Sequence, residues 1–144
     1  MTFFGDIKNQ AVAYTLFTPQ ALTQTTTSSV VDMGTAAGVG TTGLMTVGAV
    51  SGTGGPGLTV KFQECDTTNG TFADITGAAF TQVTTSGATT GVAPQLFTVF
   101  NRTKRYIQAV GTVVGTTNPS ITASVVILEQ NCIVTGKQIG RAHV

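Results

Sequence analysis

The side chains that most often carry out covalent chemistry are scarce in this sequence and do not occur in catalytic arrangements. Nucleophilic catalysis by Ser, Thr or Cys needs a nearby base such as His. The sequence contains one His, His143, next to the last residue of the chain. We therefore expect no catalytic residue and interpret the protein as a non-enzyme.

Two cysteines, Cys65 and Cys132, are the thiols that could bind a metal. They lack C-x-x-C spacing and no His lies in the body of the chain, so the pattern predicts no zinc site. The two residues are either free thiols or one disulfide, and the pattern favours free thiols.

Three carboxylates, Glu64, Asp66 and Asp74, lie close together in the sequence. Calcium loops place oxygen ligands at dense, regular spacings, which these three residues lack. We interpret them as carboxylates of turns and hairpins. The sequence thus predicts no metal and no cofactor.

Two stretches resemble phosphate-binding motifs. Residues 38–43 match G-x-G-x-x-G through Gly38, Gly40 and Gly43. That motif binds a pyrophosphate only where it joins a strand to a helix, and the residues after Gly43 favour a strand, so we interpret 34–43 as a loop. Residues 135–137, Thr-Gly-Lys, lack the other positions of a phosphate loop.

One basic cluster, formed by Arg102, Lys104 and Arg105, has Phe97, Phe100 and Tyr106 close by. A nucleic-acid patch would have this composition, but three charges on a protein with seven basic and six acidic residues neutralise too few phosphates for useful affinity. We interpret residues 101–104 as a solvated basic turn or the rim of a protein contact. We expect no nucleic-acid partner.

The overall composition predicts a weakly charged surface. Charged residues make up 9% of the 144 residues, compared with about 25% in average soluble domains. Weak self-repulsion favours packing against copies of the same chain or another protein. The N-terminus lacks the apolar run of a signal peptide and no stretch reaches the ~20 apolar residues of a membrane span, so we expect synthesis in the cytoplasm and no membrane partner.

The clearest predicted strand covers residues 105–114, with 58–65 as its expected partner. In the first, Ile107, Ala109, Gly111 and Val113 alternate with more polar residues, which is the period of a strand. In the second, Leu58, Val60 and Phe62 face one way and Lys61 and Gln63 the other. We expect these apolar residues to share a core with Ile121, Val125 and Ile127.

Further strands are predicted at 10–17, 29–33, 44–50, 71–75, 79–84, 95–100 and 120–129. The first should end before Pro19, and turns are expected at 51–57, 66–70 and 118–119, with 85–94 as the longest unstructured stretch. This pattern predicts an all-β protein: a single antiparallel β-sandwich of about eight or nine strands, for which a jelly roll is one arrangement. The domain should cover 1–138, with residues 1–9 less ordered.

The last six residues, 139–144, read Ile-Gly-Arg-Ala-His-Val. They match one reading frame of a widely used sequencing-adapter oligonucleotide, and Gln138 permits the codon ending that the adapter requires. They show neither the alternation of a strand nor a turn pattern that would connect them to a sheet. We therefore expect them to be a non-native tail.

Four segments together carry a resemblance to a protein family. They are Ser29-Val-Val-Asp-Met-Gly, Leu58-Thr-Val-Lys-Phe-Gln-Glu-Cys-Asp, Thr71-Phe-Ala-Asp-Ile and Lys104-Arg-Tyr-Ile-Gln-Ala-Val-Gly-Thr-Val. Over about residues 28–128 the chain resembles small β-rich structural proteins of tailed bacteriophages and prophages. It departs from their pattern at Cys65, where Ser is common, and at Gln108, where a basic residue is common.

This resemblance implies a non-enzymatic virion protein, synthesised in the host cytoplasm, that decorates or stabilises the phage head, or forms a minor head or tail part. Its partners would be copies of itself, capsid proteins or tail proteins. No functional residue is carried over, because such proteins act through surfaces. The alternative is a carbohydrate- or surface-binding β-sandwich module, although such modules usually carry a secretion signal and exposed aromatic residues.

Overall fold

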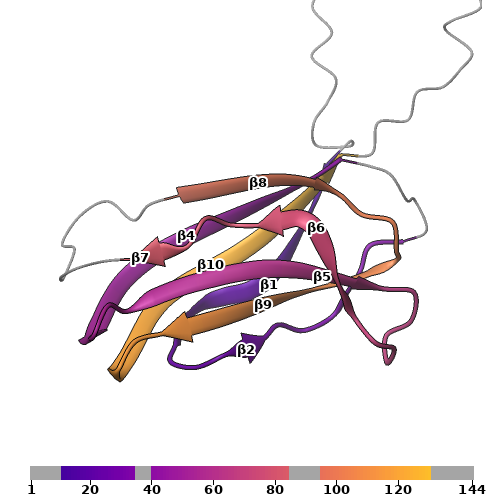
Figure 1. The fold of residues 1–144 in the computed structure, drawn as a ribbon. Helices are drawn as coiled ribbons and strands as arrows, with labels where there is room; N and C mark the ends of the chain where they lie inside the picture. The colour runs from indigo at the N-terminus through magenta and orange to yellow at the C-terminus, as the bar shows by residue number, and fades with distance from the viewer. Residues whose placement is uncertain (1–10, 35–39, 85–94, 131–144) are drawn as a thin grey trace, which may run out of the picture.

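Two antiparallel β-sheets pack face to face in this computed structural model, which describes residues 11–34, 40–84 and 95–130 (Figure 1). Sheet A has four strands, and both of its long central strands are antiparallel to their neighbours. In hydrogen-bonded order the strands are β1 (Ala11–Leu22), β10 (Thr117–Gln130), β4 (Gly40–Thr53) and β8 (Gln95–Asn101).

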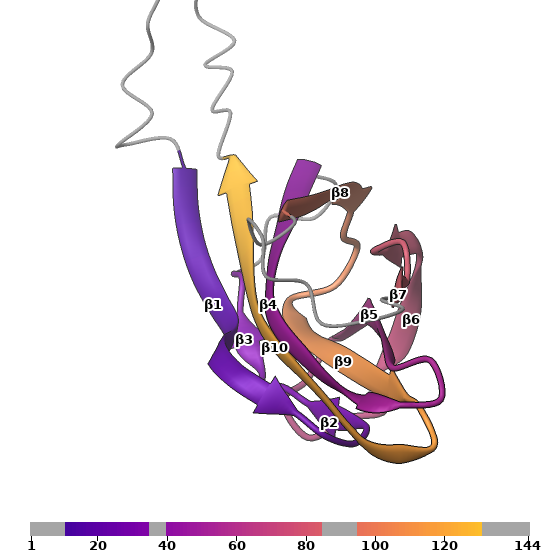
Figure 2. The same cartoon turned by 90° about the vertical axis from the view of Figure 1, so that its left-hand side faces the viewer.

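Sheet B has β9 (Tyr106–Val114) and β5 (Gly57–Cys65) at its centre. The short strands β2 (Thr26–Thr27) and β3 (Val31–Asp32) both pair with the outer edge of β9. The opposite edge of β5 pairs with β6 (Ala73–Ala79) and β7 (Val83–Thr84). Figure 2 shows the two sheets edge-on, with β1 and β8 at the two edges of sheet A.

The predicted fold class is confirmed. The described residues form an antiparallel β-sandwich of ten strands, compared with the expected eight or nine. No helix in that part of the chain is long and apolar enough to cross a membrane.

The central pairing of sheet B also agrees with the prediction. β5 and β9 pair over their full length, with Phe62 opposite Ala109 and Gly57 opposite Val114. Alternate residues of both strands are buried and the residues between them are half-buried, as expected for strands inside a sheet with one solvated face. The clear alternation in the sequence therefore located these two strands within one residue of their observed starts.

The core lies between the sheets. Its members come from every long strand, and the residues predicted to share it are all there: Leu58, Val60, Phe62, Ile107, Ala109, Ile121, Val125 and Ile127. The Phe62 ring stacks on Phe100 of sheet A with 4.8 Å between centroids and meets Phe80 at 5.5 Å. Gly43 on β4 makes room for this cluster, since a Cβ there would lie 2.9 Å from the Phe62 ring.

Several predicted strand ends are wrong because proline and glycine are accommodated within strands. β1 continues through Pro19, which lies at an irregularity between Phe17 and Gln20 on an edge strand, where a missing N–H is tolerated. β10 includes Asn118 and Pro119, at another shift of register, and Asn118 has a positive φ of 44°. The turn between β9 and β10, at residues 115–116, is therefore three residues earlier than predicted.

Further boundaries also differ from the prediction. β4 covers 40–53 and not 44–50, so residues 51–53 belong to a strand and not to the expected turn at 51–57, and β3 covers 31–32 and not 29–33. The strands expected at 71–75 and 79–84 are replaced by β6 and the short β7, and Gly77 lies inside β6 with a φ of 76°. A positive φ suits glycine and permits the irregular pairing of β6 with β5.

Some expectations fall outside the described residues. They are the less ordered segment 1–9, residues 35–39 of the expected loop with Gly38, the unstructured stretch 85–94, Cys132, residues 135–137 and the expected non-native tail 139–144 with His143.

Candidate functional site

The basic cluster lies in the turn between β8 and β9, and its three side chains have different surroundings. Arg102 is completely buried, whereas the side chain of Lys104 is 38% exposed and that of Arg105 is 45% exposed. The prediction of a solvated turn is therefore wrong for Arg102. The physical reason is a buried acceptor, Glu129, on β10.

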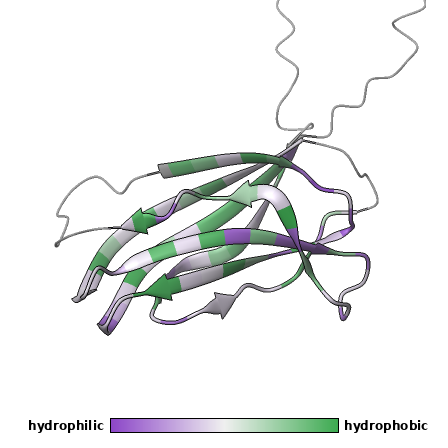
Figure 3. Cartoon of the chain, in the orientation of Figure 1, coloured by the Kyte–Doolittle hydropathy of each residue, from purple (hydrophilic) through white to green (hydrophobic). Residues whose placement is uncertain are grey.

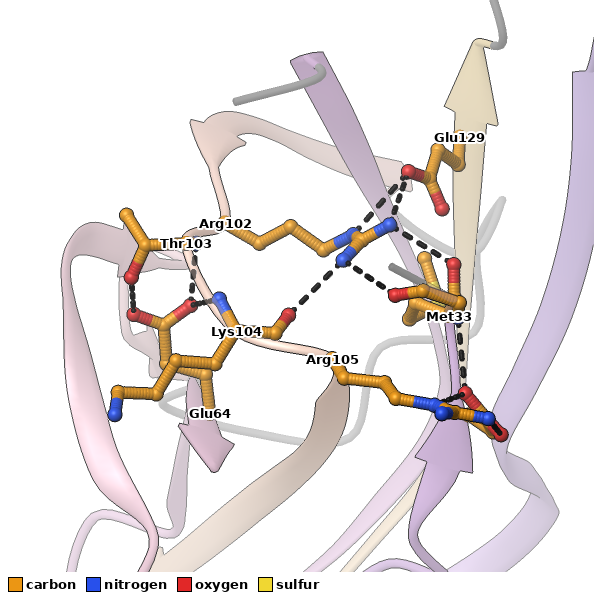
Figure 4. Close-up of polar contacts among 9 residues, drawn as sticks. Met33, Glu64, Arg102, Thr103, Lys104, Arg105 and Glu129 are labelled. Atoms are coloured by element: carbon orange, nitrogen blue, oxygen red, sulfur yellow. Dashed lines mark hydrogen bonds and ion pairs between the residues drawn. The ribbon is translucent and has the colours of Figure 1, made fainter. Parts of the chain in front are cut away.

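All five N–H donors of Arg102 have acceptors (Figure 4). Nε and Nη2 donate to Oε1 of Glu129 at 3.2 and 2.6 Å. The other three donors bind the backbone carbonyl oxygens of Met33, Gly34 and Lys104. The planar guanidinium thus ties the β8–β9 turn to β10 and to the segment after β3.

Glu64 at the end of β5 holds the same turn from the other side. Its carboxylate accepts hydrogen bonds from the backbone N–H groups of Thr103 and Lys104, and from the Thr103 hydroxyl at 2.6 Å (Figure 4). Backbone groups that would otherwise lack partners are satisfied in this way. These contacts are structural, because both carboxylates are occupied by groups of the protein itself.

In the described part of the chain, the cations that reach the surface are each paired with a carboxylate. Lys104 Nζ lies 2.6 Å from Asp66, and Lys61 Nζ lies 2.7 Å from Asp74. The hydrogen bond that Lys104 donates to Asp66 raises the pKa of Lys104, and the hydrogen bond that Lys61 donates to Asp74 lowers the pKa of Asp74. Exposed pairs of this kind contribute little to stability.

Arg105, which directly precedes β9, and Asp32 of β3 form a bidentate ion pair. Nε and Nη2 of Arg105 donate to the two carboxylate oxygens of Asp32 at 2.8 and 2.7 Å. Together with a hydrogen bond from the Gly34 N–H, this pair lowers the pKa of Asp32 from 3.8 to about 2. The Arg105 guanidinium also lies 5.2 Å from the centre of the Tyr106 ring.

The other predicted positions form no chemical site within the described chain. Asp66 lies in the turn after β5, as expected, and Asp74 lies on β6; both are exposed and in ion pairs, while Glu64 is buried near the end of β5. No group of three metal-binding side chains occurs among the residues described. Cys65 is buried and its thiol is free.

The glycine-rich motif is also not a phosphate loop where the structure describes it. Gly40 and Gly43 lie within β4 and pair with Asn101 and Thr98 of β8. The expectation of a loop is therefore wrong for residues 40–43. A paired strand has no row of free N–H groups to bind a phosphate.

The aromatic residues near the basic cluster do not form one surface with it. Phe100 is buried in the core against Phe62, and Tyr106 is half-buried beside Arg105. Phe97 is 67% exposed on β8. The three rings lie close together along the chain. In the fold, alternation along β8 points Phe97 and Phe100 to opposite faces of the sheet, and Tyr106 lies on another strand, β9.

The outer face of sheet A is the most unusual surface of the protein. Its four strands contain a single charged residue, Glu129, and that residue is buried. Within the residues that the structure describes, the exposed ion pairs all belong to sheet B and its turns. In Figure 3, green and white prevail along β4, β8 and β10, while the hydrophilic colour is concentrated in sheet B and the turns.

Apolar side chains form two adjacent rows across this face. Directly opposed residues of an antiparallel pair point to the same side of a sheet. One row contains Phe97, Leu44 and Val126, and the next contains Val99, Thr42 and Leu128. We call the five apolar members the sheet A patch: Phe97, Val99, Leu44, Val126 and Leu128.

The exposure of the patch is greatest at its β8 edge. Phe97 and Val99 are 67% and 71% exposed, and Leu128 is 36% exposed. Contiguous exposed apolar surface is characteristic of interaction sites. Sequence reasoning missed this surface, although the alternation of Phe97 and Val99 within a strand without charge was a signal for it.

A concave feature lies beside β1, apart from the sheet A patch. An open groove of about 350 Å³ is lined by residues of β1 from Thr15 to Gln20 and by residues 26–29. Irregular pairing of β1 with β10 on either side of Phe17 shapes this wall. Most of the lining side chains are hydroxyls, with the Gln20 amide among them.

Comparisons with known proteins find no protein-family model and no curated protein that match the chain. Among solved structures, dimeric latent PorU from Porphyromonas gingivalis is similar, with a TM-score of 0.50 and 11% sequence identity. The match covers 85% of this chain and 12% of the PorU chain. At this identity the likeness concerns the fold alone.

Proposed function

We propose that the protein is a non-enzymatic structural protein of a bacteriophage virion that decorates or stabilises the head through protein contacts made by the outer face of sheet A. The sequence resemblance over about residues 28–128 supports the virion assignment. Copies of the chain and capsid or tail proteins are its partners, and it reaches the virion after synthesis in the host cytoplasm.

The observation that carries the proposal is the separation of charge between the two sheets. Sheet A exposes apolar and hydroxyl side chains with no exposed charge, while sheet B carries the ion pairs. Protein interfaces are depleted of charged residues at their centre and enriched in aromatic ones. Phe97 at the edge of the patch fits this composition.

The buried polar network supports a role as a rigid building block. Arg102 and Glu64 fasten the β8–β9 turn by hydrogen bonds to three other parts of the chain. A surface held in one conformation loses little entropy when it binds. The exposed cations of sheet B are paired with carboxylates, which argues against a nucleic-acid partner.

Co-sedimentation with undecorated heads of the phage that carries the gene tests the proposal. The full chain should pellet with the heads, and Leu128→Lys, which adds a charge to the outer face of sheet A, should reduce the bound fraction. Val114→Lys is the matched control, since Val114 is similarly exposed, at 42%, but lies on sheet B. If the unmodified chain stays in the supernatant with both heads and tails, the virion proposal is wrong.

A carbohydrate-binding module is the second candidate, and the groove beside β1 is the observation that favours it. Hydroxyl and amide groups in an open groove can hydrogen-bond a sugar. A glycan array probed with the full chain and with Gln20→Ala tests this function. Binding that is lost in Gln20→Ala would support it, and an array without binding would exclude the glycans displayed.

A further inference from the structure

The edge strand β8 lacks the features that normally prevent strands from pairing between molecules. It is the last strand of sheet A, and no other strand of the described chain hydrogen-bonds to its outer edge. Natural edge strands are usually protected by charged side chains, proline or bulges. β8 reads Gln-Leu-Phe-Thr-Val-Phe-Asn, with neither charge nor proline, and pairs with β4 without irregularity.

We propose that β8 pairs antiparallel with β8 of a second copy of this chain, so that the two A sheets join into one eight-stranded sheet. A two-fold axis perpendicular to the sheet would pass beside Thr98, the middle residue of the strand. This inference rests on the proposed function in one respect: it specifies one of the proposed partners, a copy of the chain, and places it at the β8 edge, where the sheet A patch is most exposed. The contact is isologous, because each copy contributes the same strand.

The register follows from the length and pattern of β8. An axis at Thr98 pairs all seven residues, and any other register leaves strand residues without a partner. In this register Phe97 of each copy lies opposite Val99 of the other copy on the outer face, so the joint contains two such pairs. Pairs of aromatic and β-branched residues are favourable across strands. The two most exposed apolar side chains of the patch would then cover each other.

Charge explains why a second copy fits this edge. A strand without charged side chains has no electrostatic attraction for a charged partner. Two copies of such a strand can also come together without electrostatic repulsion. The charged residues of sheet B, such as Lys61 and Asp74, lie on strands that do not belong to the joined sheet. The two sheet A patches would also become continuous across the joint.

Sedimentation equilibrium of the purified full chain tests the pairing. A species of twice the 14.7 kDa chain mass is expected. Val99→Lys should weaken dimerisation by roughly tenfold or more, because two lysines replace the apolar partners of two phenylalanines. Leu128→Lys is the control: it lies on the same face but two strands away from the edge, so it should dimerise normally.

A double variant tests the register. Phe97→Lys alone should weaken the dimer, and Phe97→Lys combined with Val99→Glu should restore it, because each lysine then faces a glutamate of the other copy. Circular dichroism should be unchanged in all variants, since both positions are exposed. A chain that is monomeric, or a dimer that Val99→Lys weakens no more than Leu128→Lys, overturns the inference.

The outcomes separate this inference from the proposed function. A monomer that still pellets with phage heads overturns the β8 pairing and leaves the virion proposal standing. A dimer disrupted by Val99→Lys that never binds heads or tails supports the pairing and overturns the virion proposal.

Discussion

At the scale of single residues, Arg102 is the buried side chain that connects the β8–β9 turn to β10 and to the segment after β3. Burying a charge is costly unless it is paired and its donors are satisfied. Here the Glu129 carboxylate supplies the opposite charge and three carbonyl oxygens complete the set of acceptors. Its removal would leave Glu129 as an unpaired buried charge.

Replacing Arg102 should therefore be severe. We expect Arg102→Ala to lower the free energy of unfolding by about 3 to 5 kcal/mol, the usual cost of breaking a buried ion pair. Arg102→Lys should also destabilise, because lysine cannot reproduce the five-donor fork. Chemical denaturation measures both, with the exposed Arg105→Ala as control. Equal losses in Arg102→Ala and Arg105→Ala would contradict this role.

Asp32 provides a prediction about pH. Its pKa is lowered to about 2 by the hydrogen bonds from Arg105 and the Gly34 N–H, so its contribution to stability is present above pH 3.8 and is lost as the pH falls through about 2. Titration of the carboxyl carbon by NMR should give this midpoint. In Arg105→Ala the pKa should rise towards 3.8, and an unchanged midpoint would show that Arg105 is not the cause.

At the scale of the strands, alternation predicted the centre of the fold well. In β5 and β9 one face is apolar and the other mixed, so the sequence predicted both the position of each strand and the face that is buried. The pairing of the two strands and the core that they share followed from this pattern. The ends of strands were predicted less well.

The errors concern residues whose local preference is overridden by tertiary pairing. Pro19 and Asn118 are turn formers in isolation, but both lie at irregularities in long strands of sheet A. Arg102 was placed on the surface because its partner Glu129 is 27 residues away, and single-sequence patterns do not report such distant pairs. The order of strands was likewise not readable from the sequence.

Gly43 shows how a strand position can be determined by the opposite sheet. A Cβ at Gly43 would lie 2.9 Å from the Phe62 ring, which Phe80 and Phe100 hold in place. We expect Gly43→Ala to cost about 1 to 3 kcal/mol as overpacking. Thermal or chemical unfolding measures the loss.

Gly48 on the same strand is the matched control. A Cβ there would make ordinary contacts of 3.4 Å with Thr122, so Gly48→Ala should be nearly neutral. Combining Gly43→Ala with Phe62→Leu should cost less than the sum of the two single changes, because the smaller side chain relieves the clash. Strict additivity would mean that the two residues do not compete for space.

At the scale of the whole molecule, the division of charge predicts how assembly should depend on salt. Added salt screens exposed ion pairs, with a Debye length that falls from about 30 Å at 0.01 M to about 3 Å at 1 M. Contacts made by the uncharged sheet A should therefore persist over this range, as measured by sedimentation equilibrium. Dissociation of the dimer at high salt would instead indicate contacts through Lys61, Lys104 or Arg105.

The pairing of β1 with β10 has a consequence for how the domain can be joined to other chains. Ala11 and Gln130 are direct cross-strand partners, so the backbone enters and leaves the sandwich at one corner (Figure 1). Opposed residues of such a pair are about 5 Å apart, a gap that a short linker can bridge. The sandwich is thus suited to insertion into a loop of a host protein or to circular permutation, with new ends in the exposed turn at residues 66–70.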